Sequence, residues 1–309
     1  MARSTLIILG VIFSSACTRS NPPLTPALEE LARRQDLAII LLLASTNQEA
    51  LTLDWKSAGH LKLSGAPMTQ DLSPDGSCLA WLSLSSIPVV NGGAGKPVAF
   101  ITDAPGSKKE IKINAGGASV ISASARCDRL ALIVEDSNFS LRLIVIDSAT
   151  GGSELDLTPL IPSFNLAKAR RIQLSAAGTR LAIGSEEDFA VLDIPKLRTI
   201  AQGKGRYASL APDGATLAFV DPAETLSLLS LESQERRKLL AGYPAREVGP
   251  WSPDGRFLMA SVARLRPLSA ERMVVVDTIG DSYLPLEDLG DDSPGPSMYG
   301  WITRSLLVP

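Results

Sequence analysis

The stretch 251–262 reads WSPDGRFLMASV, and similar stretches read LSPDGSCLAW at 72–81 and LAPDGATLAF at 210–219. In each, a Pro-Asp-Gly turn is followed at once by an apolar run. Pro fixes φ near −65°, Asp hydrogen-bonds the local backbone and Gly accepts the left-handed conformation, so the motif predicts a tight turn between antiparallel strands. We assign a structural role in these turns to Ser73, Pro74, Asp75, Gly76, Pro212, Asp213, Gly214, Ser252, Pro253, Asp254 and Gly255.

The same unit recurs along the chain. Weaker forms of the turn read SARC at 124–127 and SAAG at 175–178, so successive turns begin at 73, 124, 175, 211 and 252, which are 36 to 51 residues apart. Such a period is typical of propellers and solenoids. Each turn precedes a strand that begins Leu-Ala or Leu-Met, a second apolar strand that mostly ends in Asp, and a polar third strand. With the strand that starts at Leu37, we count six copies.

These repeats predict a closed ring of small sheets. A four-stranded sheet twists and cannot hide both faces alone, so neighbouring units stack around an axis. Consecutive apolar residues in the first two strands predict burial on both faces. The first unit has no turn before Leu37, whereas the chain ends in MYGWITRSLLVP. We therefore expect an all-β, six-bladed β-propeller of four-stranded antiparallel blades over residues 36–309, closed by the C-terminal strand joining the N-terminal blade.

The pattern SPDGxxLAF, followed by an apolar strand ending in Asp and then a polar strand, resembles the repeat of TolB-type β-propellers. It is also similar to the propeller of the dipeptidyl peptidase and prolyl oligopeptidase group. The resemblance covers residues 36–309 and implies a fold rather than an activity. TolB carries an α/β domain before its propeller, where this sequence has only residues 1–36, and the hydrolase domain of the peptidases is not found. The TolB resemblance implies envelope partners such as the peptidoglycan-associated lipoprotein.

The N-terminus has the layout of an export signal, with Arg3, an apolar run over 6–13 and small residues up to Cys17. We expect residues 1–16 to be a signal peptide. Residues 14–17 resemble a bacterial lipobox, although Ser14 stands where that pattern prefers Leu. We expect lipid attachment at Cys17, which would anchor a periplasmic or outer-membrane lipoprotein to its membrane. The alternatives are a secreted soluble protein, cleaved after a small-x-small site, and an uncleaved or misread segment.

Residues 17–35 are expected to form a tether because they begin with a polar, Pro-rich run, with 27–35 helical or irregular. The apolar run 37–44 is too short to cross a bilayer and indicates a strand buried on both faces.

Two further cysteines, Cys78 and Cys127, lie in neighbouring repeats. An oxidising compartment would permit a bridge between them. Because they occupy different offsets in their repeats, their Cα atoms have no special reason to lie within disulfide range. We therefore favour two small, buried, unpaired thiols.

Charge and composition disfavour several classes of function. The net charge of −3 and the scattered Lys and Arg residues give no footprint for nucleic acid. The one histidine, His60, lies on a predicted outer strand and has no G-x-S-x-G nucleophile to serve, so we interpret it as a surface residue. Clustered His or Cys ligands for zinc are not found. We expect no catalytic residue, no metal and no cofactor.

Acidic loops and aromatic residues are further candidates, for a Ca²⁺ site and for a binding surface respectively. Carboxylates after strands, at 135–136, 186–188, 221 and 281, could bind Ca²⁺, but their repeat positions differ, which favours ordinary polar loops. The Asp residues that end second strands recur in most units and therefore predict local Asx-type bonds. Trp251 and Trp301 recur before turns and favour inter-blade packing over an aromatic binding surface, which Trp55, Trp81 and Tyr299 would complete.

These observations favour a non-catalytic, exported interaction scaffold, a bacterial envelope lipoprotein whose propeller face meets a protein or envelope polymer. The alternative is a carboxylate- or Ca-dependent propeller hydrolase or lyase that acts on a sugar or lactone. A third possibility is a sensor of a small molecule or peptide that uses the funnel without turnover.

Overall fold

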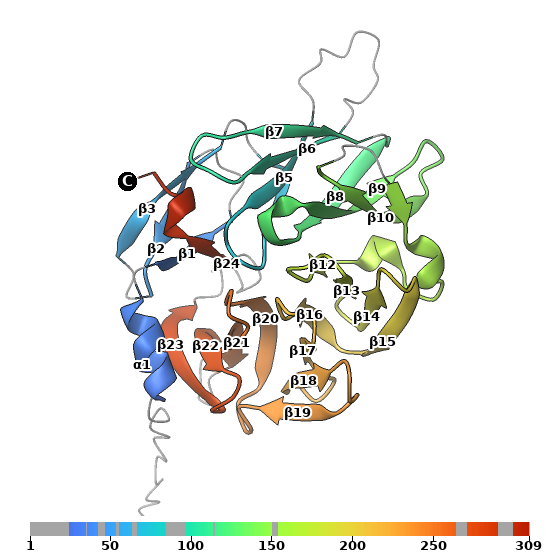
Figure 1. Ribbon diagram of the computed structural model, residues 1–309. Coiled ribbons are helices and arrows are strands. Elements are labelled where there is room, and N and C mark those ends of the chain that lie inside the picture. Colours follow the sequence, from blue (N-terminus) through green and yellow to red (C-terminus); the bar gives the residue numbers. More distant parts are fainter. Residues whose placement is uncertain are drawn as a thin grey trace, which may run out of the picture.

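The computed structural model describes residues 25–34, 36–42, 47–53, 56–63, 67–84, 97–113, 115–149, 154–263, 271–289 and 299–308. They form six four-stranded antiparallel sheets arranged as the blades of a ring around a central axis (Figure 1). The predicted all-β, six-bladed propeller is therefore confirmed.

Each blade runs outward from an innermost strand near the axis (Figure 1). Blade 1 consists of β24 (Tyr299–Thr303), β1 (Leu37–Leu41), β2 (Asn47–Leu51) and β3 (Ser57–Lys62). Blade 2 consists of β4 (Thr69–Leu72), β5 (Leu79–Leu84), β6 (Pro97–Thr102) and β7 (Lys109–Lys112). Blade 3 consists of β8 (Gly117–Ala123), β9 (Arg129–Glu135), β10 (Leu141–Asp147) and β11 (Glu154–Asp156).

The second half of the ring follows the same order. Blade 4 consists of β12 (Arg171–Leu174), β13 (Arg180–Gly184), β14 (Asp188–Asp193) and β15 (Arg198–Lys204). Blade 5 consists of β16 (Arg206–Leu210), β17 (Thr216–Val220), β18 (Leu226–Ser230) and β19 (Arg236–Leu239). Blade 6 consists of β20 (Ala245–Trp251), β21 (Phe257–Ala263), β22 (Glu271–Asp277) and β23 (Ser282–Leu289).

The apolar runs of the strands that directly follow the turns contribute to two cores at once. In β9, Leu130 and Leu132 pack with blade 2, whereas Ala131 and Ile133 pack with blade 4. Because side chains alternate across a strand, a continuous apolar run is needed wherever a blade lies between two others. The core is therefore a series of separate layers between blades.

The C-terminal strand closes the ring as expected. Strand β24 pairs with β1, with Ile39 opposite Trp301 and Leu37 opposite Thr303. The Thr303 amide also donates to the Gly76 carbonyl of blade 2 at 3.0 Å. Farther out, Val308 bridges His60 on β3, so the edge that carries the histidine is partly covered by the chain end.

Helix α1 (Pro26–Arg33) lies within the segment that we expected to be a tether. Its N-cap is Thr25, and its apolar side buries Leu28 and Leu31 in a cluster with residues of blades 1 and 6. The Thr25 hydroxyl donates to Asp277 Oδ2 at 2.9 Å, which ties the helix to blade 6. No helix in the described part of the chain is long and apolar enough to span a membrane.

The Pro-Asp-Gly turns have similar internal hydrogen bonds. In blade 2, the Ser73 hydroxyl donates to Asp75 at 2.6 Å and accepts from the Cys78 amide at 3.0 Å. Gly76 has φ of +67°, and a Cβ atom there would lie 2.9 Å from the Trp301 carbonyl oxygen. The turn thus requires glycine both for its backbone conformation and for the close approach of the closing strand.

All the turns lie on one face of the ring, which we call the turn face. Contacts between consecutive turns show this: the Ala125 amide donates to the Ala176 carbonyl, and the Ala176 amide to Pro212. The innermost strands begin on the opposite face, which we call the mouth face.

The prediction of two unpaired thiols is wrong. Cys78 and Cys127 form a disulfide between blades 2 and 3, with their Cα atoms 6.0 Å apart and both side chains fully buried. The two cysteines occupy different positions in their repeats because a residue of one blade contacts a different repeat position of the next blade. Cys78 stands just before the Leu-Ala pair of its repeat, and Cys127 stands at the glycine position of the next turn, with φ of +54°.

Other blades join at the same two positions. Arg129, just before the Leu-Ala of blade 3, donates to the Gly178 carbonyl of blade 4 at 2.9 Å. Arg180 of blade 4 donates to the Gly214 carbonyl of blade 5 at 2.5 Å. The disulfide is therefore one member of a series of clamps between turns.

The Asp residues that end second strands make the expected local bonds. Asp147, Asp193 and Asp277 accept from backbone amides two or three residues farther on, at 2.9–3.2 Å. Their repetition is thus explained by strand termination.

Candidate binding funnel

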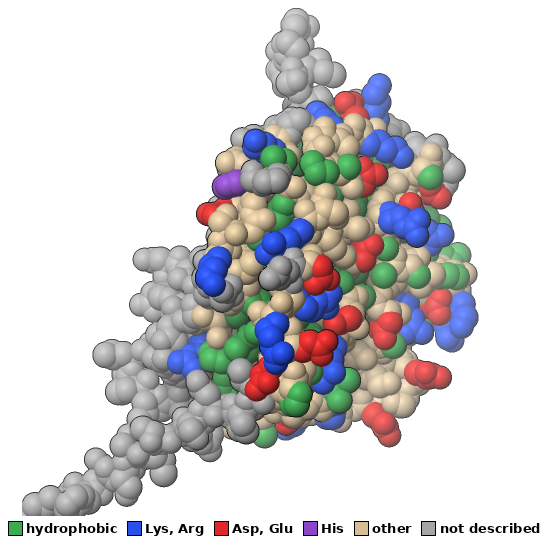
Figure 2. Space-filling view, turned by 60° about the vertical axis from the view of Figure 1, so that its left-hand side comes forward, with side chains coloured by type: hydrophobic (Ala, Val, Ile, Leu, Met, Phe, Trp, Pro, Cys, Tyr) green, Lys and Arg blue, Asp and Glu red, His purple; other side chains and the backbone are tan. Residues whose placement is uncertain are grey.

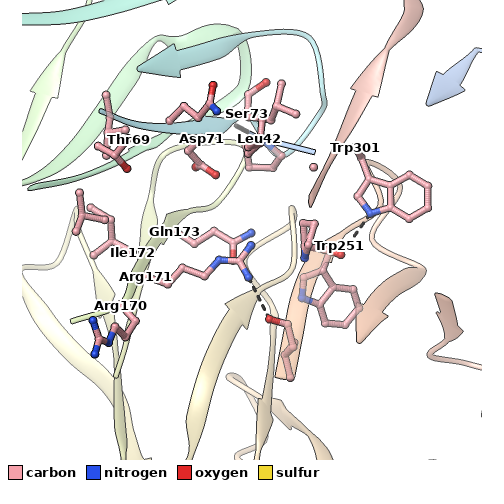
Figure 3. A pocket seen from close by; sticks show the side chains of 18 of the residues that line it. Leu42, Thr69, Asp71, Ser73, Arg170, Arg171, Ile172, Gln173, Trp251 and Trp301 are labelled. Carbon is pink, nitrogen blue, oxygen red and sulfur yellow. Dashed lines mark hydrogen bonds between the residues drawn. The ribbon is translucent and has the colours of Figure 1, made fainter. Parts of the chain in front are cut away.

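The innermost strands enclose a cavity of about 340 Å³ along the propeller axis, which we call the central cavity (Figure 3). Its wall includes residues near the start of innermost strands, such as Thr69 and Arg171, and residues of the turns, such as Pro74 and Pro212. The cavity therefore extends along these strands from the mouth face toward the turn face. It could hold roughly eleven water molecules at about 30 Å³ each.

A belt of hydrogen bonds joins the innermost strands around this cavity. The Ser122 hydroxyl of blade 3 donates to Asp71 Oδ2 of blade 2 at 2.8 Å and accepts from the Leu174 amide of blade 4 at 3.1 Å. Gln173 Oε1 accepts from the Ser209 hydroxyl of blade 5 at 3.1 Å and from the adjacent amide at 2.9 Å. Asp71 and Gln173 thus play similar parts, because the side-chain oxygen of each accepts a hydrogen bond from the next blade. Asp71 does so with a charged group and Gln173 with a neutral one.

Arg171 crosses the cavity from the first position of β12. Its Nη1 donates to the Val248 carbonyl of β20 at 3.3 Å, and the side chain remains partly exposed to the cavity (Figure 3). Burial lowers the pKa of Arg171, although the negative charges of Asp71 and Glu247 oppose that shift. A guanidinium stays protonated over the physiological range even so, and the cavity therefore contains a fixed positive charge.

Asp71 supplies negative charge from β4. Burial raises the pKa of its carboxyl to about 6, against the opposing effects of Arg171 and of the hydrogen bond from Ser122. The side chain keeps partial exposure to the cavity. At neutral pH Asp71 is therefore mostly ionised, with a proton affinity well above that of an ordinary aspartate.

Ion pairs line the mouth face around blades 4 to 6. Figure 2, which shows the molecule from another direction, likewise shows Lys and Arg side chains interspersed with Asp and Glu. Arg170 pairs with Glu186 at 3.0 Å, and Arg246 pairs with Glu224 at 2.6 Å. Exposed pairs of this kind contribute only about 0–1 kcal/mol to stability. Their consequence is a rim with little net charge next to the cavity.

Several carboxylates of the acidic loops, which were candidate Ca²⁺ ligands, accept hydrogen bonds from backbone amides instead. Asp221 Oδ1 accepts from the Ala223 and Thr225 amides at 2.9 and 3.0 Å, and Asp136 Oδ1 caps its own hairpin in the same way. Asp281 accepts from the Leu240 amide at 2.8 Å. Within the described ranges, no group of three or more His, Cys, Asp or Glu side chains is arranged to hold a metal ion.

Two of the aromatic residues that the sequence singled out, Trp251 and Trp301, line the central cavity together with Asp71 and Arg171. Trp251 and Trp301 are buried between blades, where their ring nitrogens donate to the Ser209 and Pro250 carbonyls at 3.0 and 3.3 Å, in agreement with inter-blade packing. Trp81 stacks in the core against Phe100. Cys17, Trp55 and the Tyr299 side chain lie outside what the structure describes.

Asp71 and Arg171 are not among the residues predicted from the sequence. Asp71 stands in QDLSPDG and Arg171 in RIQLSAAG, inside the strand that precedes the turn. Charged residues at that place, in a strand that lies near the axis, were the available signal.

Comparison with solved structures agrees with this architecture. TolB from Acinetobacter baumannii superposes with a TM-score of 0.54 at 14% identity, over 86% of this chain and 66% of that one. The chain has a TolB-like propeller fold. A putative TolB from Agrobacterium tumefaciens gives a TM-score of 0.51 at 14% identity, over 82% of this chain and 89% of that one.

The β-propeller domain of the Trilobed protease from Pyrococcus furiosus gives a TM-score of 0.51 at 12% identity, over 70% of this chain and 68% of that one. No protein-family model and no curated protein matches this chain. The chain spans about two thirds of the A. baumannii structure. At these identities the likeness concerns the fold alone.

Proposed function

We propose that this chain is an exported, non-catalytic binding module whose mouth face and central cavity together receive its partner, a protein or an envelope polymer. The observation that carries the proposal is the pair of partly exposed charges, Asp71 and Arg171, inside a cavity of about 340 Å³. Enclosed polar groups in a mostly apolar pocket are the usual features of a binding site.

Two sequence features support export. Residues 1–16 have the layout of a signal peptide, and Cys17 follows at a lipobox-like position, which supports a lipoprotein of the bacterial envelope. The disulfide between Cys78 and Cys127 supports the same compartment because such bonds persist where the environment is oxidising. The TolB-like fold is in keeping with an envelope partner, while nucleic acid remains disfavoured by the charge distribution.

The hydrolase or lyase alternative has no specific observation in its favour. Its loop carboxylates are engaged in capping their own loops, as at Asp221 and Asp136. We therefore expect excess Ca²⁺ and EDTA to leave the melting temperature unchanged. A rise with Ca²⁺ that EDTA reverses would favour the enzyme instead.

Site-specific photo-crosslinking tests the binding function. A benzoylphenylalanine at Tyr207, which lines the cavity and is partly exposed, should give a discrete adduct with an envelope component in intact cells. The control position is Leu197, which is 52% exposed in the turn-face loop between β14 and β15. Absence of an adduct at 207, or equal adducts at both positions, would contradict the proposal.

Mass spectrometry of the membrane-extracted chain tests the anchor separately. We expect a mature N-terminus at Cys17 that carries acyl chains. An unmodified chain that begins beyond Cys17 would refute lipid attachment and leave secretion as the alternative.

A further inference from the structure

The charges that line the central cavity differ in how they are paired. Four charged side chains line it, Asp71, Arg170, Arg171 and Glu186. Arg170 and Glu186 neutralise each other at the rim. Neither Asp71 nor Arg171 lies within salt-bridge distance of an opposite charge among the described residues, although the two charges attract each other at longer range.

Arg171 has hydrogen-bonding capacity left over. A guanidinium carries five N–H donors in a planar fork. Within the described part of the chain, Arg171 uses one of its donors, toward the Val248 carbonyl at 3.3 Å. Because the side chain lines the cavity and is partly exposed, the remaining donors can receive a carboxylate, the planar anion that this fork matches.

A simple anion is nevertheless a poor match for the whole site. Asp71 lines the same cavity, and Glu247 adds its negative charge near Arg171. Like charges repel strongly where water is scarce. A simple cation would in turn be repelled by Arg171. A ligand that carries both signs satisfies the two charges at once.

The rest of the wall is mixed, with polar residues such as Gln70 and Gln173 and several apolar ones. Val120, Ile121, Ile172 and Val248 line the cavity beside the two charges. The volume, equal to roughly eleven waters, fits a ligand of about ten heavy atoms. Of these four, Val120 is partly exposed, so an apolar group on the ligand would displace water there, whereas the other three are buried.

We propose that the central cavity binds a small zwitterion of the amino-acid class, with its carboxylate on Arg171, its ammonium group on Asp71 and its apolar part against the Val120–Ile121 wall. This inference goes beyond the proposed function, because it gives the cavity a small ligand of its own in addition to the protein or polymer partner. The ligand is a free molecule rather than a residue within a chain.

Calorimetric titration of the full-length chain with defined amino acids tests this inference. The probes are leucine, phenylalanine and a series of ω-amino acids, which vary the distance between ammonium and carboxylate. We expect at least one probe to bind, and its N-acetyl and amide forms, which lack one charge each, to bind at least about tenfold more weakly. A leucyl-leucine arm tests a longer zwitterion, and tighter binding there would overturn the assignment to a single amino acid.

Matched variants connect the binding to the two charges. Arg171→Gln and Asp71→Asn should each weaken binding at least about tenfold, because each leaves one ligand charge unpaired. Asn keeps an oxygen that can accept from Ser122, which preserves the belt. The controls Arg198→Gln and Asp128→Asn, both at exposed positions, should bind like the wild type.

Three results would overturn the inference: no probe binds at about 10 mM, a singly charged analogue binds as tightly as the zwitterion, or both cavity variants bind normally. Thermal melts check that each variant is folded. Crosslinking at position 207 reports on the binding function independently, so adducts there without zwitterion binding would refute this inference alone.

Discussion

Loss of the Cys78–Cys127 disulfide is expected to lower the free energy of unfolding by about 4 kcal/mol. The two cysteines are 49 residues apart in the sequence, and closing a loop of that length removes about 14 cal/mol/K of entropy from the unfolded chain. At 25 °C this corresponds to about 4 kcal/mol, and for a chain of this size to a fall in Tm of about 7 °C.

Urea denaturation of the Cys17→Ser protein, with and without reductant, measures the effect, because that substitution removes the third cysteine. Reductant should lower stability by the stated amount in this protein. It should have no effect on the Cys78→Ala/Cys127→Ala variant, which serves as the matched control. Two titratable thiols in the unfolded, non-reduced protein, or a difference below about 1 kcal/mol, would refute the reasoning.

Three further predictions concern the closure of the ring and the anchoring of helix α1. Trp301→Ala should cost about 3–5 kcal/mol in urea denaturation, because it removes a buried ring from the closing strand, and a loss below about 1 kcal/mol would argue against that role. Gly76→Ala should destabilise more than Gly106→Ala. Both have positive φ, but only at Gly76 would the added carbon meet the closing strand, and equal effects would contradict this. For Asp277, burial raises the pKa of the carboxyl, but hydrogen bonds led by the one from Arg256 outweigh it and hold the pKa below its ordinary value. Its contribution to stability should be present above the unfolded-state pKa and lost as pH falls through the folded-state pKa, so melting curves of Asp277→Asn should depend less on acid than those of the wild type.

The fold could be predicted because its determinants are local and repeated. A Pro-Asp-Gly turn specifies a hairpin wherever it occurs, and an apolar run such as LALIVE needs cover on both faces. The position of the C-terminal strand followed from the missing strand of the first blade. These features depend on the neighbouring residues and on the number of copies, both of which are visible in the sequence.

The disulfide and the cavity charges could not be obtained in the same way. Cys78 and Cys127 meet because neighbouring blades pack with their repeats offset by two residues. This offset is a property of how the blades stack. Asp71 and Arg171 belong to different repeats and become neighbours of one cavity only when the ring closes. Other innermost strands also carry charged residues, such as Arg206 in RYASL, so a charge in such a strand does not by itself identify a cavity residue.

Helix α1 also fixes the side of the ring on which Thr25, the first described residue, lies. Thr25 is bound to Asp277 at the end of β22, on the turn face, while the central cavity opens among the starts of the innermost strands on the other side. Cys17 stands eight residues before Thr25 in the sequence, a separation that a fully extended chain spans with at most about 29 Å. An acylated Cys17 would therefore hold the turn face toward the bilayer and direct the cavity away from the lipid, toward molecules diffusing in the surrounding aqueous space.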